Sequence, residues 1–508
     1  MKKRNFLKLA LGAFSTHLIN FPTYSSPNTS GTIRLGLEGS YKNDNFDSRK
    51  HFSPFQLSMG SGSLYETLTE IKPNGILHGE LAKNWEVVSD AKEWIFNLRK
   101  NVKFHNNKTF NADDVIDTFE FHNHENSSTK VILSSIKEIK KTSSHQIKFI
   151  LHSANSDFPN LLSDPRLIIM PSKKIEDSIK NGIGTGPYKL KLFRPGSIML
   201  AERFLAHHSS TNVGFNSVEL KAIDNPTERF NLLRENDVDV INSVPRILEI
   251  LLSNDKNFEV LHSTSNAYIC FPMNVNKKPF NDPNVRLAIK HSCNRHEIVK
   301  AVFLGQGTIG NDHPLKPSHR MYNNGIEAID YNPKKAKHLL KQSGIEKLNI
   351  TLHTSEAAFP GAIDAANIFK TYAKPANINI LISIENKETY FSDAKLKFNW
   401  YTSFSGGFPT ADWAFSANYT KNQELNNHHW GNSSFEELLV LARKETNLER
   451  RRKIYSEIQQ LFSLKGNQVI PSFYNFVIAY SKHLSHESQI GNNFPLDDCR
   501  IPKRWWFE

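Results

Sequence analysis

Cysteine is scarce in this chain, because only three of its 508 residues are cysteines. Cys270, Cys293 and Cys499 include no Cys-x-x-Cys pair. This excludes a scaffold built on disulfides and a cysteine-rich zinc module. The spacing alone leaves open whether Cys270 and Cys293 pair.

Long apolar runs are also missing. Beyond the N-terminal segment no stretch reaches the ~18 consecutive apolar residues of a membrane-spanning helix. The remaining composition, 39% hydrophobic and 22% charged residues, is that of an ordinary globular protein with room for several domains. We therefore expect no transmembrane helix.

Catalytic signatures are missing as well. The chain has no Gly-x-Ser-x-Gly elbow, no His-Glu-x-x-His motif and no compact Ser-His-Asp arrangement. The glycine-rich turn at residues 184–188 lacks the lysine of a phosphate-binding loop. We expect no catalytic residue, no cofactor and no enzymatic activity.

The charge is unbalanced, with 63 basic against 51 acidic residues and a formal net charge of +12. The basic residues are scattered, apart from the run at residues 450–453. Scattered charge is typical of a solvated basic surface, so we expect no nucleic-acid partner.

The N-terminus has the pattern of an export signal. Lys2, Lys3 and Arg4 precede a short apolar run, which is typical of a secretory signal peptide. We assign residues 1–29 to this signal. The run at 3–8 is similar to a twin-arginine signal with lysine in the first position, which leaves the twin-arginine and general secretory routes both open.

The segment from residue 64 to residue 115 predicts a compact α/β unit. Trp94, Phe96 and Leu98 alternate with less apolar residues, which predicts a strand with one buried face. Asn111 is placed to cap a helix, with acidic residues in its first turn. Farther on, strand and helix patterns alternate, which is typical of an α/β protein. They include a helix that begins at Asp157, a buried strand at residues 168–171 and a helix capped by Asp282.

Several motifs in this chain follow one another as in a known family. Their order and spacing resemble the bacterial extracellular solute-binding proteins of family 5, the peptide and nickel receptors of ABC importers. The matching segments are Tyr65-Glu66-x-Leu68, Leu81-Ala82-x-x-Trp85-Glu86, Phe96-x-Leu98-Arg99-x-x-Val102-x-Phe104-His105, Phe110-x-Ala112-x-Asp114-Val115, the Gly-Thr-Gly-Pro-Tyr at 184–188, and Pro279-Phe280-x-Asp282-x-x-Val285-Arg286.

This resemblance implies an α/β fold of two lobes, the periplasmic-binding-protein fold, with an extra small α+β domain (cluster C type). In this family the motif at residues 184–188 is a crossing between lobes. The expected division is lobe I at 30–60, 184–262 and 473–508, the extra domain at 61–183, and lobe II at 263–472.

The resemblance also implies a function. We expect a monomeric periplasmic protein that captures a peptide or peptide-like solute between its lobes and delivers it to an ABC transporter permease in the membrane. Two alternatives stay open: a metal-chelate or haem receptor of the same fold, and a secreted hydrolase.

An aromatic, glycine-containing loop at residues 400–415 is the expected ligand loop. Aromatic rings supply contact area and glycine permits close approach of the backbone. The expected ligand-binding residues are Tyr268, Trp400, Phe404, Ser405, Gly407, Phe408, Asp412 and Trp413.

This loop departs from the peptide receptors of the family at one point. There an aspartate shortly before a conserved proline pairs with the α-amino group of the peptide. Alignment on Pro409 places Gly406 or Gly407, or Ser405 with a gap, where that acid is expected. A charge-assisted bond to an ammonium group is then missing. Either another acid replaces this aspartate, or the ligand is not a peptide with a free amino terminus, so the loop itself gives no support for peptide binding.

Histidine pairs occur at residues 122 and 124, 207 and 208, and 428 and 429. Imidazole is a ligand for nickel, copper and zinc. In a chain with 21 histidines such pairs arise readily on the surface, so we expect no metal site. The pair His428-His429 follows the ligand loop and would serve the metal-chelate or haem alternative.

Overall fold

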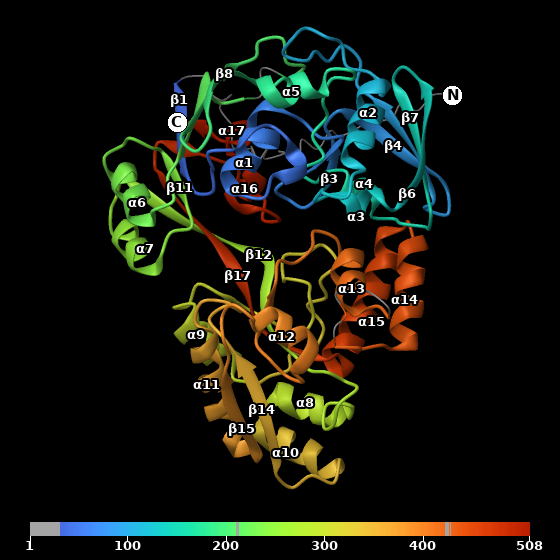
Figure 1. The fold of residues 1–508 in the computed structure, drawn as a ribbon, viewed down its shortest axis with the longest axis vertical. Helices are drawn as coiled ribbons and strands as arrows, with labels where there is room; N and C mark the ends of the chain where they lie inside the picture. Colours follow the sequence, from blue (N-terminus) through green and yellow to red (C-terminus); the bar gives the residue numbers. More distant parts are fainter. Residues whose placement is uncertain (1–30, 210–212, 422–425, 427) are drawn as a thin grey trace, which may run out of the picture.

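The computed structural model describes residues 31–209, 213–421, 426 and 428–508. The predicted signal peptide lies outside these residues. Figure 1 shows two bodies, one above the other, joined by two long strands. We call residues 31–257 and 482–508 the upper body and residues 273–467 the lower body. This two-body α/β architecture confirms the predicted fold class.

The largest sheet has nine strands and runs through both bodies. Its order is β16-β12-β17-β11-β1-β10-β9-β8, with β13 also paired to β17. The two long strands β12 and β17 are antiparallel and cross between the bodies (Figure 1). Their bounds and those of the other strands are β16 Ser403–Ser405, β12 Phe258–Pro272, β17 Gln468–Ser481, β11 Val240–Asn242, β1 Thr32–Leu37, β10 Ser217–Ala222, β9 Ile198–Arg203, β8 Tyr188–Arg194 and β13 Thr308–Ile309.

The centre of the upper body forms around β1, which pairs in parallel with β10 and β11. Ile33, Leu35 and Leu37 of β1 are fully buried. Parallel strands are covered on both faces, which explains their apolar sequence. The helices of this part are α1 Pro54–Met59, α5 Ile175–Asn181, α6 Pro226–Arg234, α7 Arg246–Ser253, α16 Pro495–Cys499 and α17 Ile501–Arg504, with the short strands β18 Leu484–Ser485 and β19 Trp506–Phe507.

The rest of the upper body contains a separate antiparallel sheet with the order β4-β5-β7-β6. Trp94, Phe96 and Leu98 point into its core, as their alternation predicts. Asn111 caps the following helix in a capping box with Asp114. The elements are β2 Thr69–Ile71, β3 Leu77–Gly79, β4 Ala82–Ser89, β5 Glu93–Leu98, β6 Ile136–Ser143, β7 Gln146–Leu151, α2 Ala112–His122, α3 Lys130–Leu133 and α4 Phe158–Leu161.

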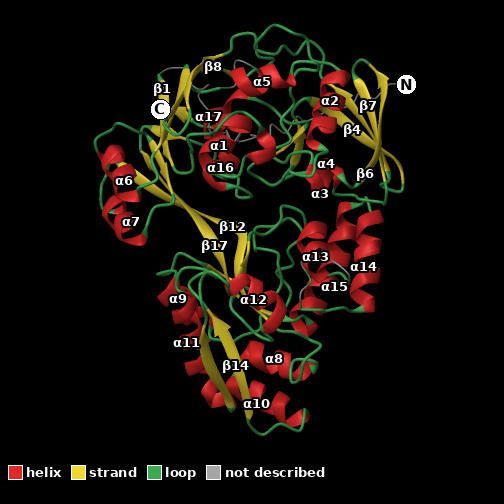
Figure 2. Ribbon diagram, in the orientation of Figure 1, coloured by secondary structure: helices red, strands yellow, loops and turns green. Residues whose placement is uncertain are grey.

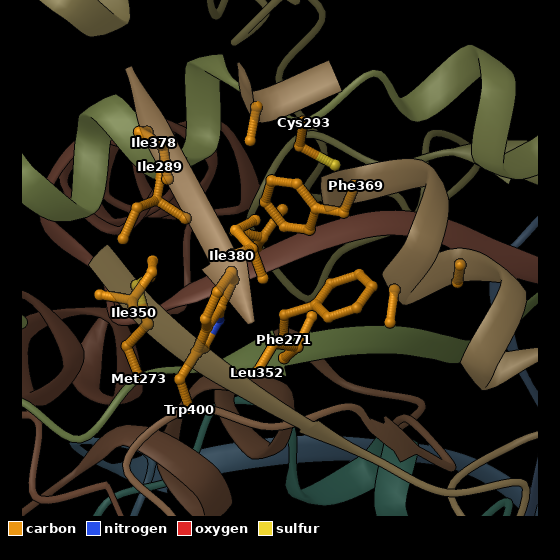
Figure 3. Close-up of a cluster of buried hydrophobic side chains, with 14 of the residues drawn as sticks. Phe271, Met273, Ile289, Cys293, Ile350, Leu352, Phe369, Ile378, Ile380 and Trp400 are labelled. Atoms are coloured by element: carbon orange, nitrogen blue, oxygen red, sulfur yellow. The ribbon is translucent and has the colours of Figure 1, made fainter. Parts of the chain in front are cut away.

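The lower body is built on two parallel strands, β14 and β15, with helices around them (Figure 2). Figure 3 shows its core, where Trp400, Phe271 and Phe369 lie close together. The elements are β14 Leu348–Thr354, β15 Ile378–Ile384, α8 Pro283–His291, α9 Arg295–Val302, α10 Pro333–Gln342, α11 Ala362–Ala373, α12 Tyr390–Lys397, α13 Ala411–Tyr419, α14 Ser433–Lys444 and α15 Leu448–Lys465.

Two local expectations are wrong. Residues 168–171 are buried but do not form the predicted strand, because the backbone N–H of Ile169 donates to the Glu66 carbonyl and that of Met170 donates to the Thr118 hydroxyl. The motif at 184–188 does not cross between the bodies. Gly184 packs against the carbonyl of Leu64 within the upper body, so close that a Cβ would lie 2.1 Å from it.

The cysteines are free and buried, so Cys270 and Cys293 do not pair. Among the described residues, no helix combines the length and the apolar character needed to cross a membrane. The lobe and domain boundaries given above remain predictions.

Candidate functional site

A narrow cavity lies where the lower body meets the upper body. It leaves about 20 Å³ for the centres of water-sized molecules, which is room for one or two waters. Its lining comes from three distant parts of the chain. The upper body contributes Ile71, Ile132, Asn160, Leu161, Ser163, Asp164 and Pro165, the lower body contributes Pro409 and Trp413, and the C-terminal segment contributes Asn493, Phe494, Asp498 and Arg500.

Trp413 is the main contact from the lower body. It lies in the first turn of α13, whose N-cap Thr410 accepts a hydrogen bond from the Trp413 backbone at 3.3 Å. Its ring packs on Phe408 with a centroid distance of 4.9 Å. The same ring reaches across to the core of the β4-β5-β7-β6 sheet. Trp413 therefore contacts both bodies at the cavity.

The C-terminal segment reaches the cavity in an unusual backbone conformation. Residues 496–499 all have positive φ, between 56° and 61°, which is unfavourable for residues with a Cβ. Asp498 fixes the preceding chain, because its Oδ1 accepts the backbone N–H groups of Asn493 and Phe494 at 2.8 and 2.9 Å. Burial raises the pKa of Asp498, while Arg504 opposes that shift. Strain held by such bonds is typical of functional sites.

Charged contacts hold the two bodies together beside the cavity. Asp157 of the upper body accepts a hydrogen bond from Arg320 of the lower body at 2.9 Å. Arg451 lies 3.3 Å from the same Asp157 oxygen. Arg320 also donates to Asn160, which lines the cavity, at 2.9 Å. We call Asp157, Asn160, Arg320 and Arg451 the interbody cluster.

A buried lysine makes a second link between the bodies. The Lys316 ammonium donates to the Thr264 carbonyl at 2.9 Å and to the Asn492 side chain at 2.8 Å. Burial lowers the pKa of Lys316 to about 7, although Asp498 opposes the shift. Lys316 therefore ties a crossing strand and the C-terminal segment to the lower body.

The structure separates the predicted ligand-binding residues into three groups. Trp413 lines the cavity and Phe408 packs on it. Phe404 and Ser405 lie on β16 beside β12, with Phe404 48% exposed. The third group is Tyr268, Trp400 and Asp412, whose side chains are engaged elsewhere, together with Gly407, which has no side chain.

Tyr268, Trp400 and Asp412 are held by other contacts. The Tyr268 hydroxyl is buried and hydrogen-bonded to Tyr419 at 2.9 Å. Trp400 is fully buried in the lower core (Figure 3). Asp412 accepts a hydrogen bond from Arg443 at 2.6 Å. These three residues are not part of the cavity lining.

The two glycines before Pro409 have different surroundings. Gly407 has a φ of +71° and lies against Asn266 of β12. No atom lies within 4 Å of a Cβ built on Gly406. An acidic side chain in place of glycine would therefore fit at residue 406 but not at residue 407.

The histidine pairs also differ. His428 is buried, its Nε2 lies 2.8 Å from the Tyr401 hydroxyl, and burial lowers its pKa to about 3. His122 is buried against Ser48 and Thr129. Neither is in a metal-binding cluster of the described residues, whereas His207 and His208 meet at Glu66.

Sequence reasoning missed the upper half of the cavity. Asn160, Asn493 and Phe494 belong to no recognisable motif, and for Asp157 the sequence predicts only the start of a helix. They come together only because the C-terminal segment folds back onto the upper body. One local feature of the sequence indicates this segment. The run from Gly491 to Asp498, which follows the last long strand, is rich in asparagine and aspartate.

Comparison with known proteins shows the family of this chain. A sequence profile of "Bacterial extracellular solute-binding proteins, family 5 Middle" matches residues 77–428. The dipeptide-binding protein of Escherichia coli strain K12 is 28% identical over 378 residues, 68% of each chain.

Two solved structures show the same fold. HbpA2 from Haemophilus parasuis has a TM-score of 0.81 at 20% identity, covering 91% of this chain and 98% of its own. The ABC transporter-associated periplasmic binding protein DppA from Helicobacter pylori, in complex with the peptide STSA, has a TM-score of 0.72 at 21% identity, covering 95% and 99%.

The two-body α/β fold with two crossing strands, together with these matches, is that of a substrate-binding protein. The chain belongs to the bacterial extracellular solute-binding proteins of family 5. The similar proteins include a dipeptide-binding protein and an ABC transporter-associated periplasmic binding protein, and solute binding is the role of this chain.

Proposed function

We propose that the protein captures a peptide or peptide-like solute between its bodies and delivers it to an ABC permease. The observation that carries this proposal is the cavity, which is lined by Trp413 from one body and by Asn160 and Phe494 from the other. Two aromatic rings supply contact area, and carboxamides match the donors and acceptors of a peptide backbone. The dipeptide-binding relative and the peptide-bound neighbour support this ligand class.

Capture requires the bodies to separate, because a cavity of about 20 Å³ has no room for a peptide. The interbody cluster and Lys316 are the contacts that break on opening and re-form on closing. The hinge is provided by β12 and β17, since these strands join the bodies. Binding and release complete the cycle without a covalent step, in an exported, monomeric periplasmic protein.

No loop carboxylate is left for the amino end of the ligand, because Gly406 and Gly407 carry none and Asp412 is held by Arg443. The two acids that line the cavity are also engaged: Asp164 is held by Arg166 at 2.8 and 2.6 Å, and Asp498 accepts two backbone N–H groups. We therefore infer that the peptide backbone and side chains, more than an α-ammonium group, supply the affinity.

The two alternatives have less support. The haem or metal-chelate receptor built on His428 and His429 requires a free His428, whose Nε2 faces the Tyr401 hydroxyl. A hydrolase requires a base beside a nucleophile, and no histidine accompanies Ser163 among the described residues that line the cavity.

Native mass spectrometry of protein purified without refolding tests the proposal, followed by release and sequencing of the ligand. Calorimetry then compares one bound peptide with its N-acetylated form. We expect the released ligand to be a peptide. We expect N-acetylation to change its affinity by less than about tenfold, which is smaller than the effect of losing a charge-assisted bond. A non-peptide ligand that binds between the bodies, or a library without any binding peptide, would overturn it.

A further inference from the structure

A second group of side chains in the upper body shares no residue with the lining of the cavity between the bodies. Glu66 follows α1, and His207 and His208 lie in the loop between β9 and β10. The Nε2 atoms of His207 and His208 lie 3.2 and 2.9 Å from Oε1 of Glu66. One donor atom of each residue lies within 4.8 Å of the other two.

These distances match those between ligands of one metal ion. Zinc binds imidazole nitrogen and carboxylate oxygen at about 2.0–2.2 Å, and two such ligands in a tetrahedron are about 3.3 Å apart. The observed separations of 3.2 and 2.9 Å come near that value. Small movements of the three side chains are enough to admit an ion.

Glu66 also has an unused ligand atom. Its side chain is buried, and Oε2 has no hydrogen-bond partner among the described residues. A buried carboxylate oxygen without a partner is costly. A metal ion at this place would engage it, since a carboxylate binds through one or both oxygens.

The ion pairs of the neighbouring carboxylates also favour a cation at Glu66. Glu70 is paired with Lys72 and Arg504, at 2.7 and 2.8 Å. Glu80 is paired with Arg500 and Lys503 (2.5 and 3.1 Å). Glu66, by contrast, has only the two imidazoles as ionic partners among the described residues. Lys503 acts on Glu66 only from beyond ion-pair distance, so the position next to the carboxylate is left for a cation that imidazole also binds.

The site is open to solvent on one side. A pocket of about 290 Å³ is lined by Glu66, His207, His208 and Ser209 together with Lys72 and Arg99. An ion can enter through this pocket, and a water can occupy the remaining coordination position.

The Nδ1 atoms of the two histidines differ in how well their hydrogen bonds suit a metal ion at Nε2. His208 Nδ1 lies 3.1 Å from the Ser209 hydroxyl, which can accept its proton and leave Nε2 free for a metal. His207 Nδ1 accepts the Ser209 backbone N–H at 3.2 Å, which makes Nε2 the donor toward Glu66. A metal ion at Nε2 would require the ring proton on Nδ1 and the Ser209 N–H turned aside.

We propose that Glu66, His207 and His208 bind a divalent transition-metal ion of the zinc or nickel type in the upper body. This site does not depend on the solute. It uses none of the cavity-lining residues.

Calorimetric titration of untagged, chelator-stripped protein with ZnCl2, and separately with NiCl2, tests the site. We expect one ion per chain. H207Q and H208Q retain a donor for Glu66 but lose the imidazole. Each should weaken binding by more than the roughly 10- to 100-fold that follows loss of an outer-shell partner. E66Q should do the same.

Three controls separate this site from others. H124Q, at an exposed histidine, and W413A, at the cavity, should leave metal affinity unchanged. The metal should raise the melting temperature of the unaltered protein and not that of H208Q. The proposal is overturned if the unaltered protein shows no saturable binding, or if H207Q and H208Q bind the ion as tightly as it does.

Discussion

Gly407 of the lower body lies directly against the backbone of Asn266 on the crossing strand β12. A Cβ atom on this glycine would come within 1.9 Å of the Asn266 carbonyl oxygen. The loop that faces the upper body is therefore seated on the hinge strand itself. A side chain added at residue 407 would therefore displace either the loop or the hinge strand.

The first prediction concerns the missing acid. We expect G407D to destabilise the protein by about 2–4 kcal/mol, because it combines a backbone clash with positive φ. G406D should leave the melting temperature almost unchanged, since no atom lies within 4 Å of its Cβ. Thermal unfolding measures both, and equal stability of the two variants would contradict the structure.

The second prediction concerns the interbody cluster. D157A removes the anion that Arg320 and Arg451 share, and breaking a buried ion pair is strongly unfavourable. We expect about 2 kcal/mol weaker solute binding and a larger radius of gyration in small-angle scattering. The matched control is E449Q, which removes the exposed pair of Glu449 with Arg452 and should change affinity by less than about 0.5 kcal/mol. Unchanged scattering of D157A would show that the cluster does not hold the bodies closed.

The third prediction concerns pH. The ordinary pKa of lysine is 10.5, whereas burial lowers that of Lys316 to about 7. Between these values the unfolded chain binds more protons than the folded chain, so the free energy of unfolding rises with pH. Below pH 7 both states are protonated and the contribution of Lys316 no longer varies.

Calorimetry at pH 7 and pH 9 measures this effect. We expect K316Q to reduce the gain in stability between the two pH values by about 1–3 kcal/mol. K300Q, at an exposed lysine, is the control and should keep the full gain. If K316Q shows the same pH dependence as the unaltered protein, Lys316 is not buried as described.

The fourth prediction concerns Trp413. W413A should weaken solute binding by about 2 kcal/mol or more, as expected for a tryptophan at the centre of a contact. W413F should retain part of the affinity but lose most of the fluorescence change on binding. W85F removes a tryptophan of the β4-β5-β7-β6 sheet and should keep that change. Full affinity in W413A would place the solute elsewhere.

The fifth prediction concerns the cysteines. Burial raises the pKa of Cys270 and Cys293 to about 12, and it raises that of Cys499 as well. Buried thiols of high pKa react slowly, because the thiolate is the nucleophile. Alkylation followed by mass spectrometry should label none of them in the native protein and all three after denaturation. Rapid native labelling would contradict this burial.

Local sequence determined much of the fold. The alternation at Trp94, Phe96 and Leu98 gave a half-buried strand, and Asn111 and Asp282 cap the helices they were expected to cap. Such features depend on neighbours a few residues apart, so their pattern is visible in the sequence. The strand predicted at residues 168–171 is wrong, because a buried apolar run carries no information on its hydrogen-bond partners.

Tertiary structure decided the site. The sequence marked Trp413 and the glycines, but it could not show that Asp412 turns to Arg443 or that Trp400 enters the core. The cavity joins residues more than 400 positions apart, such as Ile71 and Asn493. Glu66 meets His208 across 142 positions for the same reason. Contacts of this range follow from the packing of whole sheets and helices, and no local period or spacing encodes them.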